Sequence, residues 1–343
     1  MARRMTDPLG EQPPIQTGQT FCCEETGRDV ACDGSGQDAE FRRGSPWPEP
    51  RFEPSGEIVL DRLTGLTWAR DASLVELPTS FSEALAFVGR MNREGALGRS
   101  DWRLPNRREL RSLVSHAVVK PALPSGHPFL NVVETWYWSS TTAAVNTRHA
   151  WYVHMAGARM FYGAKDQSYF VWPVSGAGNG LLPNTGQRRC FDDLGRIAPC
   201  RETGQDAETR SGRPWPTLRF EAQGEAVRDR LTGLVWRRSA ALSRDPATWS
   251  EALAQVEALN RTAADRAWRW RLPNINELET LVDCDACRPA LPAGHPFEDV
   301  KDGYWSSTTS AFERDWAFAL YLDKGAVGVG QKRGRHFHAW AVR

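Results

Sequence analysis

The sequence predicts two tandem domains that each combine helices with strands. The first observation is a repeat: Cys22 recurs as Cys190 and Trp138 recurs as Trp305, so the spacing is 168 residues and then 167 after one residue is lost. A period this long indicates a duplicated domain rather than a solenoid of short units. The second observation is that each copy shows helical spacing of apolar residues in its middle and strand-like alternation near its end.

We expect four segments along the chain. Residues 17–175 and 185–343 are the two domains, and each is long enough to bury a core of its own. Residues 176–184 are a short, Gly-rich linker, and residues 1–16 are expected to form a disordered tail. This tail has basic residues but lacks the apolar core of a signal peptide.

The composition narrows the class of protein. The hydrophobic content of 41% is ordinary for a soluble globular chain, and the net charge of +1 disfavours a general nucleic-acid binder. No stretch approaches the roughly 18 apolar residues of a membrane span, so we expect no membrane insertion. The local basic cluster at residues 332–335 is interpreted as a solvated loop.

Each copy opens with a polar, Gly-rich segment that carries two cysteines ten residues apart. They are Cys22 and Cys32 in the first copy, and Cys190 and Cys200 in the second. We expect each pair to form a disulfide that closes a hairpin, giving each domain a Cys-clamped N-terminal arm. Repeated pairs of this kind favour an oxidising compartment, so we expect an extracytoplasmic protein, whether periplasmic, cell-surface or secreted.

A third cysteine pair occurs in the second copy, where Cys284 and Cys287 form a Cys-x-x-Cys motif. We expect a disulfide here, because a zinc site would need two further ligands at matching spacing and none lies nearby. The sequence leaves open the redox state of this pair and of the unmatched Cys23.

Two helices are predicted in each copy. Residues 82–88 and 250–256 carry apolar side chains at helical spacing and predict the first helix. The second helix follows a Trp-Arg-Leu-Pro-Asn motif. Its Asn106 and Asn274 each stand three residues before a Glu, which is the spacing of a capping box.

Strands dominate the rest of each copy. The Asp-x-Leu-Thr-Gly motifs at residues 61–65 and 229–233 predict hairpin turns, in which Gly supplies the positive φ. Residues 137–142 and 304–309 begin the late strands. Apolar and polar residues alternate along these strands, which predicts one buried face.

Serine and histidine side chains are the candidate catalytic groups: Ser139, Ser140, Ser306, Ser307, His127 and His295. A serine nucleophile needs a base within hydrogen-bond reach, and the sequence offers no evident partner. We interpret the serines as partners of the backbone at a strand end and the histidines as loop residues. We therefore expect no catalytic residue and no cofactor.

Metal binding is also disfavoured. His336 and His338 would share a face of a strand, but two histidines alone make a weak metal site. Calcium-dependent sugar binding needs several oxygen ligands clustered in loops, and neither copy has a Glu-Pro-Asn or Gln-Pro-Asp tripeptide. We expect no metal site.

The motifs of both copies carry a family resemblance. They include D-x-L-T-G-L-x-W, W-R-L-P-N, P-A-L-P-x-G-H-P-F and Y-W-S-S-T-T, in the same order twice. They resemble the bacterial DUF1566 family, also called the Legionella collagen-like protein C-terminal (Lcl_C) domain, over nearly all of residues 17–175 and 185–343. The second copy departs from the pattern, with Arg269 where the first has Asp101.

The resemblance implies two tandem C-type-lectin-like domains of α+β class, each with two helices packed on twisted antiparallel sheets. It also implies relatives that bind ligands at the cell surface, sulfated polysaccharides among them. In some relatives retroelements diversify the C-terminal strands. The R-L-P-x-x-x-E-L element also resembles formylglycine-generating, sulfatase-modifying enzymes. Those depend on reactive cysteines late in the domain, whereas no Cys follows Cys287.

The copies differ most in two windows between strands of matching pattern. Residues 143–149 differ from 310–315, and residues 154–168 differ from 321–335. Aromatic and Arg side chains in these windows match the composition of binding hot spots, although neutral drift in exposed loops would look similar. The candidate ligand-binding residues are Asn146, Arg148, His154, Arg159, Tyr162, Lys165, Phe312, Arg314, Tyr321, Asp323, Lys324, Lys332 and Arg333.

We therefore predict a non-catalytic adhesin or receptor that recognises a surface glycan, sulfated or neutral, or a protein. Two sites on one short tether would gain by avidity, and a homo-oligomer stays open. One alternative is a receptor diversified by retroelements in residues 304–342. A second is the sulfatase-modifying type of enzyme, disfavoured by the missing late cysteines. A third is a structural spacer.

Overall fold

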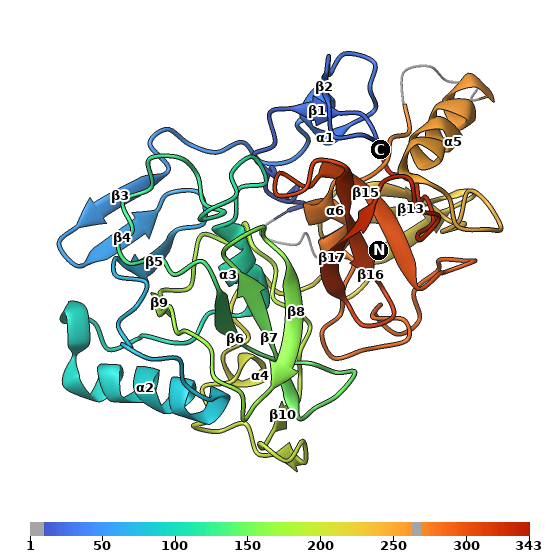
Figure 1. Cartoon of the computed structure of the whole chain (residues 1–343). Helices are drawn as coiled ribbons and strands as arrows, with labels where there is room; N and C mark the ends of the chain where they lie inside the picture. Colours follow the sequence, from blue (N-terminus) through green and yellow to red (C-terminus); the bar gives the residue numbers. More distant parts are fainter. Residues whose placement is uncertain (1–9, 263–268) are drawn as a thin grey trace.

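The computed structural model describes residues 10–262 and 269–343, and its centre is one six-stranded antiparallel sheet built by both repeats (Figure 1). The strand order is β15-β16-β17-β8-β7-β6. The strands are β6 Trp136–Thr142, β7 His149–His154, β8 Met160–Ala164, β15 Gly303–Thr309, β16 Trp316–Tyr321 and β17 Ala326–Gln331. The repeats join where β8 pairs with β17 through Met160 and Val327. The predicted α+β class is confirmed, with mostly sheet and few helices.

A smaller sheet flanks the central one in each repeat. In the first repeat it has four strands: β3 Phe52–Ser55, β4 Ile58–Asp61, β5 Leu66–Ala69 and β9 Val174–Ser175. In the second it has three: β12 Phe220–Gln223, β13 Ala226–Asp229 and β14 Val235–Arg237. The turns predicted after β4 and β13 are present. Gly65 and Gly233 adopt φ values of 71° and 77° there, which glycine tolerates without strain.

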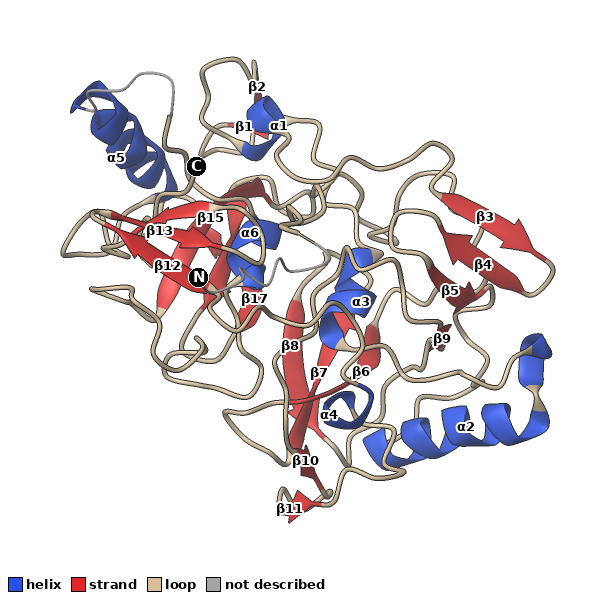
Figure 2. Cartoon of the chain, turned by 180° about the vertical axis from the view of Figure 1, so that it is seen from behind, coloured by secondary structure: helices blue, strands red, loops and turns tan. Residues whose placement is uncertain are grey.

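Two helices from each repeat cover opposite faces of the central sheet, as Figure 2 shows from behind. The long helices are α2 Phe81–Glu94, followed by the short 3-10 turn η1 Ala96–Gly98, and α5 Trp249–Thr262. The short ones are α3 Arg107–Ser112 and α6 Ile275–Thr280. Phe81 of α2 packs against Trp138, whereas Leu110 of α3 joins the core around Trp151. Successive side chains of a strand point to opposite faces, so α2 and α3 lie on opposite sides.

The predicted capping boxes of the short helices are confirmed. Asn106 accepts from the backbone N–H of Glu109, whose side chain accepts in return from the Asn106 backbone. Asn274 and Glu277 form the same reciprocal pair. Each pair satisfies backbone donors that the start of a helix leaves without a partner.

The N-terminal arms are exchanged between the repeats. Arm 1, residues 17–41, contains β1 Cys22–Cys23, β2 Asp29–Val30 and α1 Asp38–Phe41, and it packs on β15 of the second repeat. Arm 2, residues 185–209, contains β10 Cys190–Phe191, β11 Ile197–Ala198 and α4 Asp206–Thr209, and it packs on β6 of the first repeat. Figures 1 and 2 show α1 beside β15 and α4 beside β6 and β7.

Two hydrogen-bond motifs seat arm 1 on the second repeat. The Gln19 amide donates to the Thr309 carbonyl at 2.6 Å and accepts from the Thr309 backbone N–H at 2.9 Å. The buried Asp38 carboxyl accepts from the hydroxyls of Thr17 and Thr308, each at 2.7 Å. These residues are buried, so arm 1 is integral to the fold rather than a surface appendage.

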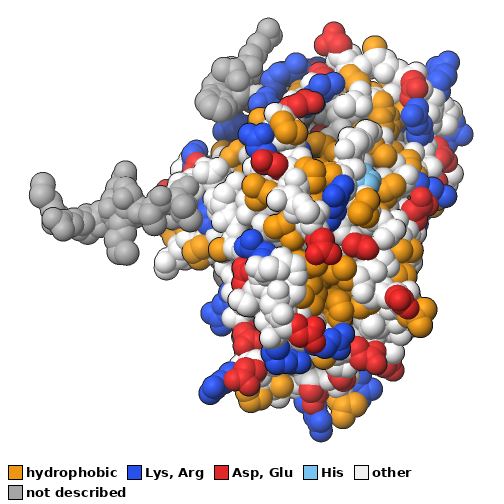
Figure 3. All heavy atoms as spheres, turned by 90° about the vertical axis from the view of Figure 1, so that its left-hand side faces the viewer, with side chains coloured by type: hydrophobic (Ala, Val, Ile, Leu, Met, Phe, Trp, Pro, Cys, Tyr) orange, Lys and Arg blue, Asp and Glu red, His pale blue; other side chains and the backbone are white. Residues whose placement is uncertain are grey.

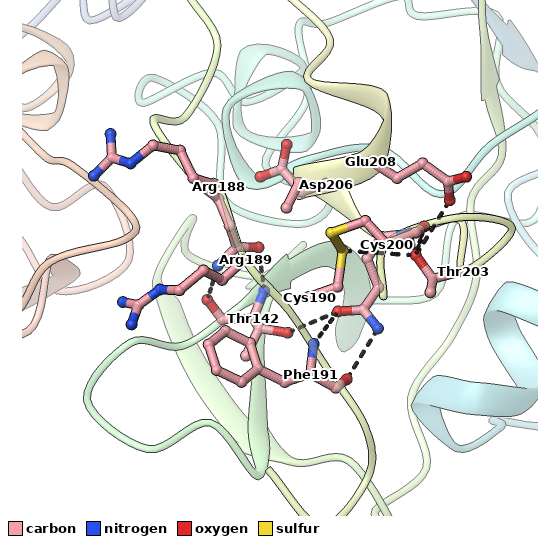
Figure 4. The surroundings of a disulfide bond; sticks show 12 residues. Thr142, Arg188, Arg189, Cys190, Phe191, Cys200, Thr203, Asp206 and Glu208 are labelled. Carbon is pink, nitrogen blue, oxygen red and sulfur yellow. Dashed lines mark hydrogen bonds between the residues drawn. A yellow bond between two sulfur atoms is a disulfide. The ribbon is translucent and has the colours of Figure 1, made fainter. Parts of the chain in front are cut away.

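Arm 2 repeats this chemistry on the first repeat. The Gln187 side-chain amide donates to the Thr142 carbonyl at 2.7 Å and accepts from the Thr142 backbone N–H at 2.9 Å. Asp206 accepts from Thr141 and Thr185, each at 2.6 Å. Figure 4 shows this seat, with Thr142 and Asp206 beside the disulfide of arm 2. The same residue types at equivalent positions hold both arms.

Residues 10–16 correct one prediction, because they do not form part of a disordered tail. The Gln12 backbone N–H donates to the Leu231 carbonyl at 3.3 Å, and the side chain of Glu11 pairs with Arg228 at 2.5 Å. Ile15 is buried. The segment is an extended strap over the second repeat; residues 1–9 lie outside the described residues. Residues 176–184, expected as a linker, include an equivalent strap in which Asn179 donates to the Thr64 carbonyl.

The predicted disulfides in the arms are confirmed, as Cys22–Cys32 and Cys190–Cys200. The predicted disulfide between Cys284 and Cys287 is wrong, because both are free. Cys284 is buried in the core, while the Cys287 thiol lies 3.8 Å from the Ala144 carbonyl across the seam between the repeats. Their side chains therefore face different surroundings.

Reducing both disulfides is expected to lower the free energy of unfolding by about 2–3 kcal/mol each, because each closes a loop of ten residues in the unfolded chain. Urea unfolding with and without reductant measures the change. A variant with all four arm cysteines replaced by alanine is the control and should not respond. An equal response from that variant would contradict the assignment.

The contact between the short helices is asymmetric. Three buried arginines of α3 face the second repeat: Arg107, Arg108 and Arg111. Arg107 and Arg108 both lie 3.3 Å from the carboxylate of Glu279 in α6. At a spacing of 168 residues, Glu279 is the counterpart of Arg111. The two copies therefore differ in a complementary way: the first carries the positive side chains at this contact and the second carries the carboxylate that pairs with two of them.

Candidate functional site

A groove of about 280 Å³ opens at the seam, and both repeats line it. Its residues come from the β7–β8 hairpin and the start of β6 in the first repeat, and from the β15–β16 loop in the second. Three of them are residues predicted from the sequence: His154, Arg159 and Phe312. The hairpin tip and the loop meet because β8 pairs with β17, which brings the two ends of the sheet halves together.

One wall of the groove is aromatic. Trp136 at the start of β6 lies opposite His154 across the antiparallel pair, with ring centroids 4.1 Å apart. Tyr152 continues the row, its ring 4.3 Å from that of Trp136. All three are half-buried. Burial lowers the pKa of His154, so this side chain is neutral at pH 7 and extends the apolar wall.

Phe312, which is 44% exposed, also lines the groove. Gly157 lies beneath the Phe312 ring; a Cβ there would sit 3.5 Å from the ring. The Lys120 ammonium lies 5.6 Å from the ring centroid, within cation–π distance. A large exposed aromatic ring beside a lysine is a feature of binding surfaces more than of cores.

Charged side chains close the groove at its ends. Arg159 pairs with Glu313 across the seam at 2.7 Å, and both side chains are about one-third exposed. Glu134 adds one acid on the rim. The groove thus combines aromatic walls with donors of both Lys and Arg type, which suits a polar ligand with an apolar face.

The equivalent position on the other side of the seam does not carry the residues that build this groove. The position of Trp136 is Gly303, that of Arg159 is Ala326, and that of Phe312 is Val145 in the first repeat. The Phe337 ring packs so closely on Gly303 that a Cβ would come within 2.6 Å of it. A tryptophan could not stand there, so the equivalent position does not form a second copy of the groove.

Two of the three predicted lysines, Lys165 and Lys332, are too buried to meet a ligand, which corrects the sequence interpretation. Lys165 and Lys332 are 1% and 0% exposed. Lys165 donates to the Phe191 and Asp192 carbonyls of arm 2 at 3.0 and 3.2 Å. Lys332 donates to Cys23 and Glu24 of arm 1 at 3.1 and 3.3 Å. Both ammonium groups hold an arm in its seat.

Three further predicted residues shape the arm contacts. Arg314 pairs with Asp29 of arm 1 at 2.5 Å. Arg148 donates to the Leu194 carbonyl of arm 2 at 3.2 Å, and Asn146 accepts from the Arg148 backbone inside the same loop. The copies differ in this window partly because each loop fits a different arm.

The remaining predicted residues lie apart from the groove lining. Tyr162 is on the opposite face of the sheet from His154, its ring 5.2 Å from that of Trp151. Asp323 and Lys324 form a 3.5 Å pair at the second hairpin, with Lys324 5.0 Å above the ring of Tyr321. Arg333 is exposed.

Sequence reasoning missed five residues of the groove: Lys120, Glu134, Trp136, Ala156 and Gly157. The signal for one of them was present, because Trp136 is matched by Gly303. That difference lay at the start of a strand whose remaining residues agree between the copies, outside the two windows of divergence. Trp136 and Phe312 line the same groove through contacts between distant residues, which no local pattern reveals.

Two of the candidate catalytic groups have structural partners, whereas Ser140 Oγ and the Nδ1 atoms of His127 and His295 are buried without a hydrogen-bond partner in the part of the chain that the structure describes. The Ser139 and Ser306 hydroxyls donate to the Trp151 and Phe318 carbonyls at 2.9 and 2.8 Å. Burial raises the pKa of the Cys284 thiol to about 12, so it is protonated at neutral pH. Among the described residues, no group of three or more His, Cys, Asp or Glu side chains could hold a metal ion.

The family comparison agrees with the duplicated pattern. A model of the Lcl C-terminal domain matches residues 57–175 and again residues 225–343. The chain belongs to the Lcl C-terminal domain family. The two matched stretches include the central sheet and the groove, and both leave out the exchanged arms. No curated protein sequence matches the chain significantly.

The disulfides bear on the compartment in which the protein folds. Two disulfides are typical of an oxidising, extracytoplasmic environment. Within residues 10–262 and 269–343, no helix is both long and apolar enough to cross a membrane.

Proposed function

We propose that this Lcl C-terminal domain protein is a non-catalytic adhesin or receptor that recognises a surface glycan or protein through the groove at the seam. One observation carries the proposal: His154 and Arg159 of one repeat meet Phe312 of the other around Trp136. The groove volume of about 280 Å³ is close to that of small-ligand sites.

The chemistry of the groove favours a ligand with an apolar face and polar edges. Sugar rings and peptide side chains both present such faces, and Trp136 and Phe312 offer aromatic rings to cover them. Lys120 and Arg159 provide donors for hydroxyl, sulfate or carboxylate oxygens. The sequence led us to expect two separate sites that would gain affinity by avidity. We propose instead one composite site lined by both repeats.

The surface supports a local site over broad electrostatic attraction. Exposed apolar residues of the first repeat include Leu60 in β4 and Leu77 before α2. Figure 3 shows the face over these elements, where acidic and basic side chains are interspersed among hydrophobic ones. A face of mixed charge does not attract a polyanion along its whole length.

We also propose that each repeat has a C-type-lectin-like fold and that the protein acts outside the cytoplasm. Two helices on antiparallel sheets in each repeat support a C-type-lectin-like domain. An adhesin or receptor would act at the cell surface or after secretion, where the disulfides are stable. The bonds from the Ser139 and Ser306 hydroxyls to backbone carbonyls, and the burial of Cys284, support a protein that catalyses no reaction.

Binding of the whole chain to a panel of neutral and sulfated polysaccharides tests the proposal. Binding that weakens with salt and survives EDTA is expected, because Lys120 and Arg159 supply the charge and no calcium is required. Binding abolished by EDTA would contradict a calcium-free site. Absence of binding across the panel would remove the glycan and leave a protein ligand.

A further inference from the structure

We propose that a second, smaller cavity between α3 and α6 binds one small monovalent anion against Arg111. The cavity measures about 40 Å³ and lies where the two straps cross the seam. Arg108, Arg111, Asn276 and Glu279 line it, with Ile15 and Leu182 at its rim. That volume accommodates about three water-sized molecules, so an ion fits and a polysaccharide does not.

The charges around the cavity do not balance. Arg107, Arg108 and Arg111 are all buried, and the Glu279 carboxylate pairs with Arg107 and Arg108. Among the described residues, no carboxylate oxygen lies within 4 Å of Arg111 in an ion pair. A buried charge without a counter-charge is costly, so an opposite charge at this place would stabilise the fold.

The hydrogen-bond partners of Arg111 are neutral. Its guanidinium donates to the Ala158 carbonyl at 3.2 Å and the Asn276 side-chain oxygen at 2.9 Å. It also lies 3.4 Å from the His116 ring. Burial and the nearby Arg111 lower the pKa of His116 well below its usual range, so this ring adds no charge. The side chain is 5% exposed and lines the cavity.

The walls select the kind of anion. Pro14, Ile15, Leu181, Leu182 and Pro183 make the rim apolar. Large or multivalent anions would lose hydration there without replacement. Chloride or a short carboxylate such as acetate fits, and the planar guanidinium matches the carboxylate in geometry. The cavity shares no lining residue with the ligand groove, so the two proposals stand or fall separately.

Thermal unfolding of the full chain tests the site. Sodium chloride and sodium acetate are titrated at constant ionic strength against sodium gluconate, whose anion is too large to enter. We expect a saturable rise in Tm of about 2–5 °C for one or both small anions. A rise with chloride alone or acetate alone identifies the occupant. Identical curves in all three salts would overturn the proposal.

Two variants locate the effect. Arg111→Met should abolish the difference between salts, because the buried charge is gone. Leu182→Phe should reduce it by narrowing the mouth, and it keeps the test decisive if the first variant folds poorly. Arg201→Met, on an exposed side chain, is the matched control and should keep the full difference. A difference that persists in both cavity variants would overturn the site.

Discussion

Replacing Arg108 with alanine is expected to lower the free energy of unfolding by about 3–5 kcal/mol, the cost of breaking a buried ion pair. The Arg108 guanidinium donates to the Val282 carbonyl at 2.7 Å and to the Asn184 carbonyl at 2.6 Å. It also donates to the carbonyls of Glu279 and Thr280 at 3.3 Å. One side chain of the first repeat therefore caps the C-terminal end of α6 in the second.

Urea unfolding followed by tryptophan fluorescence measures this loss. Because the central sheet and the main core are shared by both repeats, wild type should unfold in one cooperative transition. The exposed Arg62→Ala is the control, with an expected change within about 0.5 kcal/mol. Two separate transitions in wild type, or an Arg108 variant as stable as the control, would contradict the shared fold.

Replacing Asp38 and Asp206 with asparagine is expected to change how stability depends on pH. Burial raises the pKa of each carboxyl to about 6, and the threonine hydroxyls around it offset only part of this shift. Unfolded aspartate titrates near 3.8. Between these values the unfolded chain releases the proton first, so wild type loses stability as pH rises from about 4 to about 6.

The loss corresponds to about 3 kcal/mol for each carboxyl at full ionisation. Asparagine keeps the shape and cannot ionise. The Asn variants should therefore match wild type near pH 4 and exceed it at pH 7.5. Comparison with the variants is essential, because buried neutral histidines such as His116 lose stability in acid and oppose the trend. A difference that does not vary with pH would show that the carboxyls are not protonated in the fold.

Local features of the fold could be predicted from sequence because local interactions determine them. The capping boxes at Asn106 and Asn274, the turns at Gly65 and Gly233, and the arm disulfides each depend on residues close in the chain. The α+β class follows from those elements.

Contacts between distant residues could not be predicted in the same way. The pairing of β8 with β17 and the seat of Gln19 on Thr309 join residues 167 and 290 apart. No periodicity encodes which copy an arm will contact. A polar, Gly-rich arm with two cysteines reads equally well as a surface hairpin.

Lys165 and Lys332 show that comparing equivalent positions of the two copies separates scaffold residues from ligand-binding candidates. Lys165 and Lys332 are equivalent, so agreement between the copies already favoured a scaffold role over a diverged ligand surface. The opposite holds for Trp136 and Gly303, whose difference marks the groove. Divergence at this strand end marked a groove residue that divergence within the loops did not.

Binding of groove variants to the ligand identified from the panel tests the central claim most directly. Trp136→Ala and Phe312→Ala each remove one aromatic ring from the groove, and each should weaken binding about tenfold or more, as hot-spot residues do. Leu77→Ala, an exposed apolar control outside the groove, should bind as wild type does. Affinity unchanged in both groove variants would contradict a ligand site shared by the two repeats.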